Sequence, residues 1–158
     1  MYKIYADGGC SGNPGPGGWA FLILEETEKR RQVVRTVLKE KKGAEEETTN
    51  NRMELIAVIR GLETFKRLCL GTAAEVWTDS QYVQKGMTEW VAIWQERDWQ
   101  NNEGKPVKNQ DLWFQLLELA QDLSLEWRWV RGHNGDEYNE RCDTLTQRAI
   151  ASIADDWD

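Results

Sequence analysis

Polar and apolar residues alternate along the first part of the chain, which is the pattern of β-strands. From Tyr2 to Asp7, one face carries Tyr2, Ile4 and Ala6, and the strand is expected to end at Asp7 on the other face. Two further strands are predicted over residues 19–24 and 32–38, at a spacing typical of an antiparallel meander. The strongly polar segment that follows is predicted to be a loop.

The second part of the chain shows helical periodicity between short strands. Thr49 and the asparagines after it can cap a helix whose apolar positions recur every three or four residues, with Glu54 in the first turn. A short strand then finishes on Asp79, helical segments follow, and Asn109 can cap another helix before a strand over residues 125–130. The chain closes as a helix that begins at Tyr138 and gives way to a C-terminal tail from about residue 151.

This order of elements predicts an α/β fold in which helices cover a mixed sheet. With 158 residues and 40% apolar content, residues 1–158 suit a single domain. No long apolar run is present and the N-terminus lacks the pattern of a signal peptide, so we expect a cytoplasmic protein that does not enter the membrane. The cysteines, Cys10, Cys69 and Cys142, are odd in number and form no CxxC pair, which disfavours disulfides and zinc.

Two of the predicted strands finish on aspartates, Asp7 and Asp79. In open α/β sheets, sites form beyond the carboxyl ends of strands, so these two carboxylates are expected to meet there. Asp7 opens the stretch DGGCSGNPGPGGWA, in which glycines and prolines permit a tight turn and leave room for a bulky polymer to approach.

Five sequence words in a fixed order make the chain resemble type 1 ribonuclease H, which cuts the RNA strand of RNA/DNA hybrids. They are DGGCSGNPGPGGWA, TTNNRMELIAVIRGLE, VWTDSQYV, KNQDLW and WVRGHNGDEYNERCDTL, and the resemblance covers residues 2 to about 150. It implies a ribonuclease H-like fold with a five-stranded mixed sheet, of which the first three strands are antiparallel, flanked by helices.

The resemblance implies a catalytic centre made of carboxylates. The family's metal ligands correspond to Asp7, Glu54, Asp79 and Asp143, with Asp7 expected to bridge two Mg²⁺ ions, for which Mn²⁺ can substitute. Without metal, these carboxylates should repel one another and raise at least one pKa. His133, the only histidine, corresponds to a mobile proton carrier of the family.

The resemblance also implies contacts to both strands of the hybrid. The RNA strand would be contacted by Cys10, Asn13, Asn50, Asn51 and Gln81, although helix capping alone could explain the two adjacent asparagines, and a buried thiol could explain the cysteine. Thr49 and Asn109 match the family's pocket for a DNA phosphate, and Trp90 matches an aromatic residue that packs against a deoxyribose. Trp129, on a predicted strand, is expected in the core. The expected partner is the hybrid alone, bound by a monomer with no obligate protein partner.

The chain departs from the family in its charge. The net charge is −7, whereas affinity for phosphate comes largely from Lys and Arg. The segment over residues 86–109, strongly basic in many bacterial relatives, carries three basic and four acidic residues here. Weaker hybrid binding is therefore expected. The run KRRQVVRTVLKEKK, with seven basic residues and one acid, is a candidate for compensating this weaker binding, but a solvated edge strand that resists strand pairing is the favoured interpretation.

Alternative functions are less consistent with these motifs. A non-catalytic module that binds hybrids would tolerate loss of a carboxylate, yet all four are present. A phosphotransferase or ATPase would need a loop such as GxxxxGK[ST], which is absent. A 3′-5′ exonuclease typically carries a DxE pair on its first strand, but Asp7 is followed two residues later by Gly9.

Overall fold

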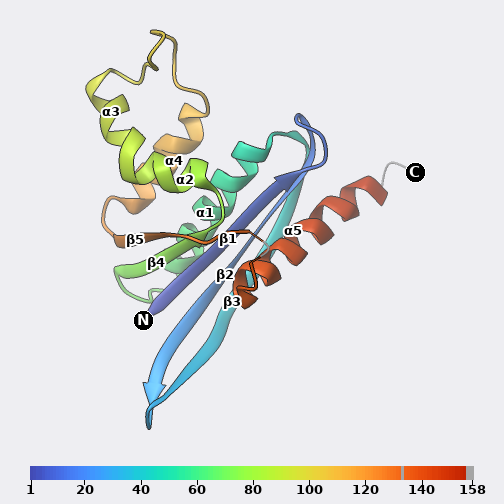
Figure 1. Cartoon of the computed structure of the whole chain (residues 1–158), viewed down its shortest axis with the longest axis vertical. Helices are drawn as coiled ribbons and strands as arrows, with labels where there is room; N and C mark the ends of the chain where they lie inside the picture. The colour runs from blue at the N-terminus through green and yellow to red at the C-terminus, as the bar shows by residue number, and fades with distance from the viewer. Residues whose placement is uncertain (133, 156–158) are drawn as a thin grey trace.

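The computed structural model describes residues 1–132 and 134–155. Five strands form a single sheet in the order β3-β2-β1-β4-β5, with helices on both of its faces (Figure 1). The elements in chain order are β1 (Tyr2–Cys10), β2 (Gly15–Lys29), β3 (Gln32–Thr48), α1 (Asn50–Arg67), β4 (Ala73–Thr78), α2 (Gln81–Lys85), the π-helical turn η1 (Gly86–Trp90), α3 (Val91–Glu96), α4 (Gln110–Ala120), β5 (Ser124–Trp129) and α5 (Glu137–Asp155).

The sheet is mixed, as expected. β1 pairs with β2 and β2 with β3 in antiparallel register, whereas β4 runs parallel to both β1 and β5. The central strand β1 thus joins an antiparallel half to a parallel half. Among the described residues, none of the helices is long and apolar enough to cross a membrane, and all three cysteines are free thiols.

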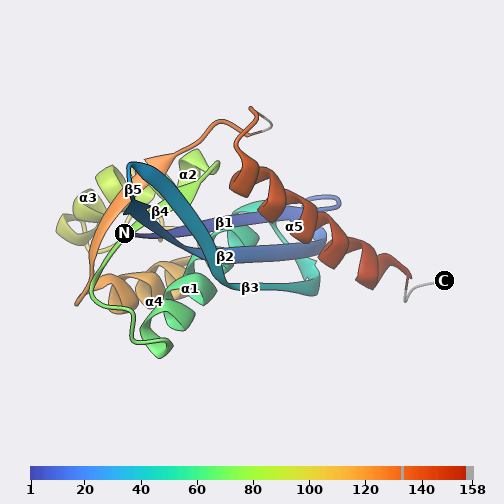
Figure 2. The same ribbon diagram turned by 90° about the horizontal axis from the view of Figure 1, so that it is seen from below.

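Helices form a layer on each side of the sheet. Figure 2 shows α5 on one face and α1 with α4 on the other. The alternation in β1 serves both layers, because Ile4 and Ala6 belong to the large core beneath α1, while Tyr5 packs in a smaller core that includes Cys142 of α5. In β2, Phe21 and Leu22 point to opposite cores and are both fully buried.

The first three strands are longer than the alternation predicts. β1 does not end at Asp7, because residues up to Cys10 continue the pairing with β2. The predicted polar loop after residue 38 is wrong, since β3 continues to Thr48 and its charged residues pair with β2. Lys and Glu have little intrinsic preference for strands, so cross-strand pairing decides this segment.

Two helix boundaries also differ from the expectation. The side chain of Thr49 caps α1 by accepting a hydrogen bond from the Arg52 N–H, so the helix begins at Asn50 and Glu54 lies at the start of its second turn. At the other end of the chain, α5 continues through residues 151–155, so the predicted tail belongs to the helix up to Asp155.

The segment between α2 and α4 protrudes from one end of the sheet (Figure 1). An aromatic network holds it together: Trp94 contacts Trp90, Trp99 and Trp113 with ring centroids 5.4–5.9 Å apart. Gly86 is essential to this packing, because a Cβ atom there would lie 2.0 Å from the Trp113 ring. The protrusion therefore keeps a defined fold without a basic surface.

Candidate active site

The candidate site lies where β4 ends beside β1. The parallel pairing of these strands stops at the pair Ala6 and Thr78, while β1 continues along β2 alone. Asp7 is the first residue of β1 beyond that pair, and Asp79 directly follows β4. Two strands that run in the same direction thus bring their aspartates to the same edge, as the sequence predicts.

Gly8 brings the third carboxylate to this edge. A Cβ atom at Gly8 would lie 2.3 Å from the carbonyl carbon of Met53 and 2.5 Å from the backbone nitrogen of Glu54, so only glycine lets α1 come this close. The Gly8 N–H also donates a hydrogen bond to the Glu54 carboxylate. This glycine therefore serves the packing of a helix on a strand rather than a turn.

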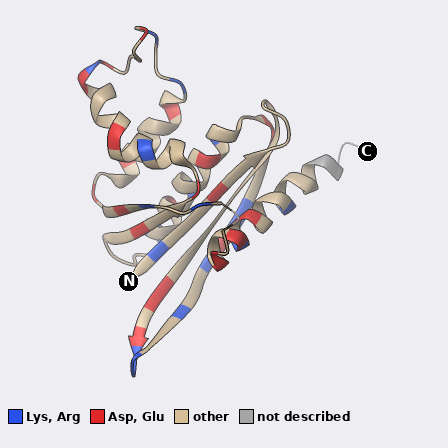
Figure 3. Cartoon of the chain, viewed as in Figure 1, with Lys and Arg blue, Asp and Glu red and all other residues tan. Residues whose placement is uncertain are grey.

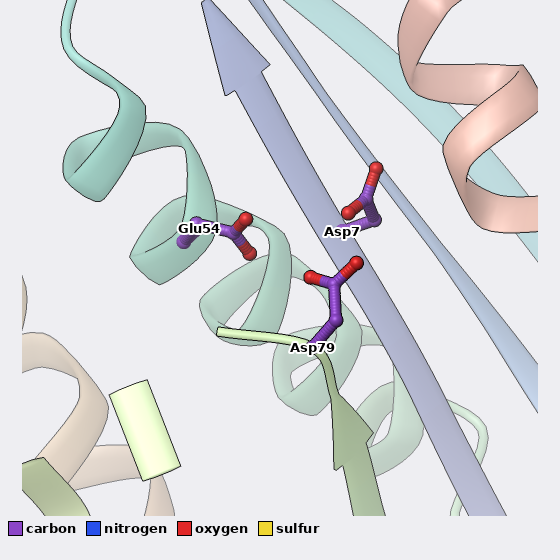
Figure 4. A group of neighbouring side chains, drawn as sticks. All are labelled: Asp7, Glu54 and Asp79. Atoms are coloured by element: carbon purple, nitrogen blue, oxygen red, sulfur yellow. The ribbon is translucent and has the colours of Figure 1, made fainter. Parts of the chain in front are cut away.

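The three carboxylates converge from three different elements (Figure 4). One oxygen each of Asp7, Glu54 and Asp79 lies within 4.8 Å of the others. Asp7 and Glu54 are buried and Asp79 is partly exposed. The cluster is therefore open to solvent on the side of Asp79 and closed behind Glu54.

Burial and mutual repulsion raise the pKa values in this cluster. Loss of hydration and the charge of Asp79 raise the pKa of Asp7 from 3.8 to about 8. The pKa of Glu54 is raised well above its ordinary value, first by burial and then by the charges of Asp7 and Asp79. Asp143 on α5 contributes to both shifts through its charge, although it lies outside the group whose oxygens are within 4.8 Å.

The donor set fits a hard divalent cation. Among the described residues, the Oε2 atom of Glu54 is buried and has no hydrogen-bond partner, which is costly for a carboxylate oxygen unless a ligand satisfies it. All three groups offer carboxylate oxygens, which suit Mg²⁺ or Mn²⁺ better than zinc. A cation here would also offset the repulsion that raises the pKa values.

Two residues that the sequence analysis did not assign to the site hold Asp79. The indole Nε1 of Trp129 donates a hydrogen bond of 3.0 Å to the Asp79 carbonyl oxygen. The expectation that Trp129 belongs to the core is wrong, because the residue is 43% exposed at the end of β5. Gly132 passes so close that a Cβ atom there would lie 3.1 Å from Oδ2 of Asp79. In sequence, these residues look like a strand end and a loop.

The residues predicted to contact RNA gather mainly around the start of α1. The Cys10 thiol donates to the carbonyl oxygens of Gly15 and Thr48 at 3.3 Å, so it ties the β1–β2 turn to the end of β3. Asn13, in that turn, accepts a hydrogen bond from the Asn50 N–H. The exposed side chains of this predicted set are Asn13, Asn50, Asn51 and Gln81.

The predicted phosphate pocket contains a cation that sequence reasoning missed. Arg52 donates its backbone N–H to the Thr49 side chain and its Nη1 to Oδ1 of Asn109 at 3.3 Å, which links the two predicted residues. Arg52 also pairs with Asp111 at 2.8 Å. The feature of the sequence that could have identified Arg52 is its position two residues before Glu54. Asn109 adopts a left-handed backbone with φ of 63° and makes no side-chain cap, contrary to the prediction.

Trp90 lies beside this pocket in the protrusion. Its ring centroid is 5.9 Å from that of Tyr82, whose hydroxyl accepts a hydrogen bond from the Asn109 side chain. The residues predicted to contact the DNA strand are thus structurally connected. His133 lies outside the described residues.

Comparison with known proteins agrees with this arrangement. The family model for RNase H matches residues 1–151. The chain belongs to the ribonuclease H family. Members of this family degrade the RNA of RNA/DNA hybrids. The fold and the carboxylate cluster described above therefore belong to a member of a nuclease family.

Similar proteins match this chain over nearly its whole length. Ribonuclease H of Cupriavidus pinatubonensis is 49% identical over 151 residues, which cover 96% of each protein. Ribonuclease H of Methylobacillus flagellatus is 50% identical over 97% of this chain and 93% of its own. Among solved structures, LC9-RNase H1, a type 1 RNase H with the type 2 active-site motif, shares 33% identity over 96% of this chain and 72% of its own, with a TM-score of 0.82.

Proposed function

We propose that this protein is a metal-dependent endoribonuclease that hydrolyses the RNA strand of RNA/DNA hybrids and leaves a 5′-phosphate and a 3′-hydroxyl. The observation that carries this proposal is the convergence of Asp7, Glu54 and Asp79, whose oxygens lie within 4.8 Å of one another, with one buried Glu54 oxygen that has no partner in the described part of the chain. Family membership supports the substrate. The proposed setting is the cytoplasm, with the protein acting as a monomer.

The proposed cofactor is Mg²⁺, with Mn²⁺ able to replace it. Asp7, Glu54 and Asp79 would hold the metal, and Asp143 would complete the set. When bound, such ions would activate a water molecule and stabilise the leaving oxygen.

The protein fixes its carboxylates in advance of substrate binding. The Gly8 N–H orients Glu54, and the Trp129 indole restrains the backbone of Asp79. The Thr146 hydroxyl donates to the Asp7 carbonyl oxygen at 3.3 Å, which ties β1 to α5. Ligands held in this way lose less entropy when a metal or a phosphate arrives.

The proposed recognition of the hybrid uses two groups of residues. Cys10, Asn13, Asn50, Asn51 and Gln81 would face the RNA strand, where short polar groups can reach a 2′-hydroxyl. Thr49, Asn109 and Trp90 would face the DNA strand, and the contacts of Arg52 with Thr49 and Asn109 support a phosphate pocket there.

The direct test uses one end-labelled RNA in three forms: single strand, RNA duplex and RNA/DNA hybrid. Each is incubated with Mg²⁺ or with chelator, beside the Asp79→Asn variant. Cleavage of only the hybrid, only with metal and only by the wild type supports the proposal. If the wild type binds the hybrid but does not cut it, the protein is a non-catalytic hybrid-binding module.

A second test separates the metal ligands from the proton carrier proposed for His133. His133→Ala should slow turnover about severalfold to a hundredfold, because water or buffer can partly replace a proton carrier. Asp79→Asn should nearly abolish turnover, because it removes a ligand charge. Equal losses from the two variants would contradict this division of roles.

A further inference from the structure

The outer strand β3 carries a feature that hybrid cleavage does not use. It is 17 residues long and lies at the edge of the sheet, and within residues 1–132 and 134–155 its single strand partner is β2. Nearly all of its residues from Gln32 to Glu47 are exposed or half-exposed. A long open edge strand usually invites another chain to bind, so its side chains decide which partner it accepts.

Unpaired cations concentrate along this strand and its hairpin. Of the seven basic residues over 29–42, Arg35 pairs with Glu26 at 3.0 Å, and the single acid, Glu40, pairs with Arg141 at 2.8 Å. Within the described part of the chain, the six other cations are exposed and make no ion pair: Lys29, Arg30, Arg31, Lys39, Lys41 and Lys42. Figure 3 shows basic residues along this strand and at the hairpin tip. In a protein of net charge −7, this region has the opposite sign.

Apolar side chains interrupt the cations. Val33 is 53% exposed, Val34 40% and Leu38 36%. Consecutive strand residues point to opposite faces, so Val33 and Val34 present apolar surface on both sides of the hairpin. An extended row of cations with apolar surface between them suits single-stranded nucleic acid, whose phosphates need positive charge and whose unstacked bases need apolar contact.

The position of β3 suits nucleic acid outside the catalytic cleft. Asp7 pairs with Ala20 across the sheet and Ala20 pairs with Lys42, so Lys42 is two strands from the site, about 10 Å in backbone distance. From Lys42 the strand runs roughly 40 Å to Arg30 at the hairpin tip, at the end of the sheet opposite the β1–β2 turn (Figure 1). A flexible strand that leaves the cleft can follow this row, whereas a short hybrid held at the carboxylates cannot reach its end.

Charge argues against a second copy of the chain as the occupant of the cationic part of the edge. Strands that pair edge to edge over residues 29–42 would bring lysines and arginines of both copies together, and such cations oppose pairing. The acidic residues 45–47 mark the end of the cationic row on the side of the β1–β2 turn.

We propose that β3 and its hairpin bind the single-stranded RNA or DNA that flanks a hybrid. The proposal rests on the function proposed above, because it extends the same substrate beyond the cleft. It also gives this acidic protein a source of electrostatic affinity that its protrusion lacks, since the protrusion carries fewer basic than acidic residues.

The experiment compares one hybrid in two forms, blunt or with a single-stranded tail of about fifteen nucleotides, a length that matches the row of cations. Binding is measured by fluorescence anisotropy in the Asp79→Asn background, so that turnover does not interfere. The test variant carries Lys39→Gln, Lys41→Gln and Lys42→Gln. The matched control removes the same charge from the protrusion through Arg97→Gln, Lys105→Gln and Lys108→Gln.

At low salt, the single-stranded tail should tighten binding to the parent protein about tenfold, because β3 contacts the tail. The triple β3 variant should lose most of this gain. The slope of log affinity against log salt concentration for the tailed substrate should also become shallower by about two, because each of the three lost phosphate contacts accounts for roughly 0.7. The control should keep the ratio of tailed to blunt affinity. A tail without effect on the parent protein, or a gain that survives in the β3 variant, would refute the proposal, and β3 would then be free to bind an acidic protein.

Failure of this proposal differs from failure of the proposed function. If the blunt hybrid is not cut by the wild type with Mg²⁺, the catalytic proposal fails whatever the tail does. If the blunt hybrid is cut while the tail has no effect, only the role of β3 is wrong.

Discussion

The change Asp7→Asn should stabilise the metal-free protein while it abolishes cleavage. Asp7 is 4% exposed, and burial together with the charge of Asp79 raises its pKa to about 8. Between about pH 4 and pH 8 the native state keeps a proton that the unfolded chain releases, so stability falls as the pH rises. An amide of the same shape removes this cost because it cannot ionise.

The size of the effect follows from the shift. One pKa unit corresponds to about 1.4 kcal/mol, so a carboxyl with a native pKa near 8 costs roughly 4 kcal/mol at pH 7 relative to an unshifted one. Neighbouring carboxylates share this cost, and we expect Asp7→Asn to recover about half, roughly 2 kcal/mol. For a domain of this size, that is a rise in Tm of about 4–8 °C.

The assay is thermal unfolding in chelator from pH 4 to pH 8, repeated with millimolar Mg²⁺. The advantage of the variant should be small near pH 4, close to the unfolded-state pKa of 3.8, and should grow towards pH 8. Mg²⁺ should stabilise the wild type and have little effect on Asp7→Asn, because a ligand that binds only the native state raises Tm. Glu103→Gln is the matched control, since Glu103 is exposed and pairs only with Lys105 at 3.6 Å among the described residues.

Two results would refute this reasoning. The first is a Tm of Asp7→Asn in chelator that equals or falls below that of the wild type from pH 6 to pH 8. It would show that burial and repulsion of the carboxylates do not destabilise the native state. A wild-type Tm that millimolar Mg²⁺ leaves unchanged would show that the cluster does not bind this metal in the absence of substrate.

Three further predictions address the framework of the site and its charge. Gly8→Ala should destabilise the fold by about 2 kcal/mol or more and reduce cleavage, because its Cβ would lie 2.3 Å from the backbone of Met53. Denaturant unfolding should show a lower midpoint concentration with an unchanged dependence of the unfolding free energy on denaturant. An unchanged midpoint would contradict this prediction. Trp129→Phe keeps an aromatic ring but loses the N–H that donates to the Asp79 carbonyl oxygen. The kcat should therefore fall severalfold and the Mg²⁺ concentration needed for activity should rise, while KM for the hybrid stays nearly constant. A change in KM alone would assign the indole to substrate binding instead. This protein should bind blunt hybrids more weakly, and with a shallower salt dependence, than a relative with a basic protrusion does. A salt titration that gives tight binding with a steep slope would contradict this prediction.

Much of the site could be predicted because its chemistry depends on particular residue types. Asp7 and Asp79 each lie at the end of a predicted strand, and parallel strands bring such ends together. The family resemblance added Glu54, which neither alternation nor composition would have linked to them. The raised pKa values could also be anticipated, because carboxylates that share a buried cleft repel one another.

The lengths of the strands could not be predicted from local pattern. β3 continues through a segment whose charged side chains are typical of a loop, because hydrogen bonds to β2 are available along its whole length. Gly8 looked like part of a turn, yet the deciding contact is with the backbone of Met53, far along the chain. Trp129 looked like a core residue, but β5 lies at a sheet edge that leaves its ring exposed.

The amino-acid sequence by itself determined the class of fold, the family and the candidate carboxylates, because residue types and their periodicity are local properties. Only the tertiary structure decided that Gly8 admits α1, that Trp129 holds Asp79 and that Arg52 links Thr49 to Asn109. These are contacts between segments distant in sequence, and the packing of β1, α1 and β5 creates them. The same holds for the cations of β3, which line an exposed edge only because that strand is the outermost of the sheet.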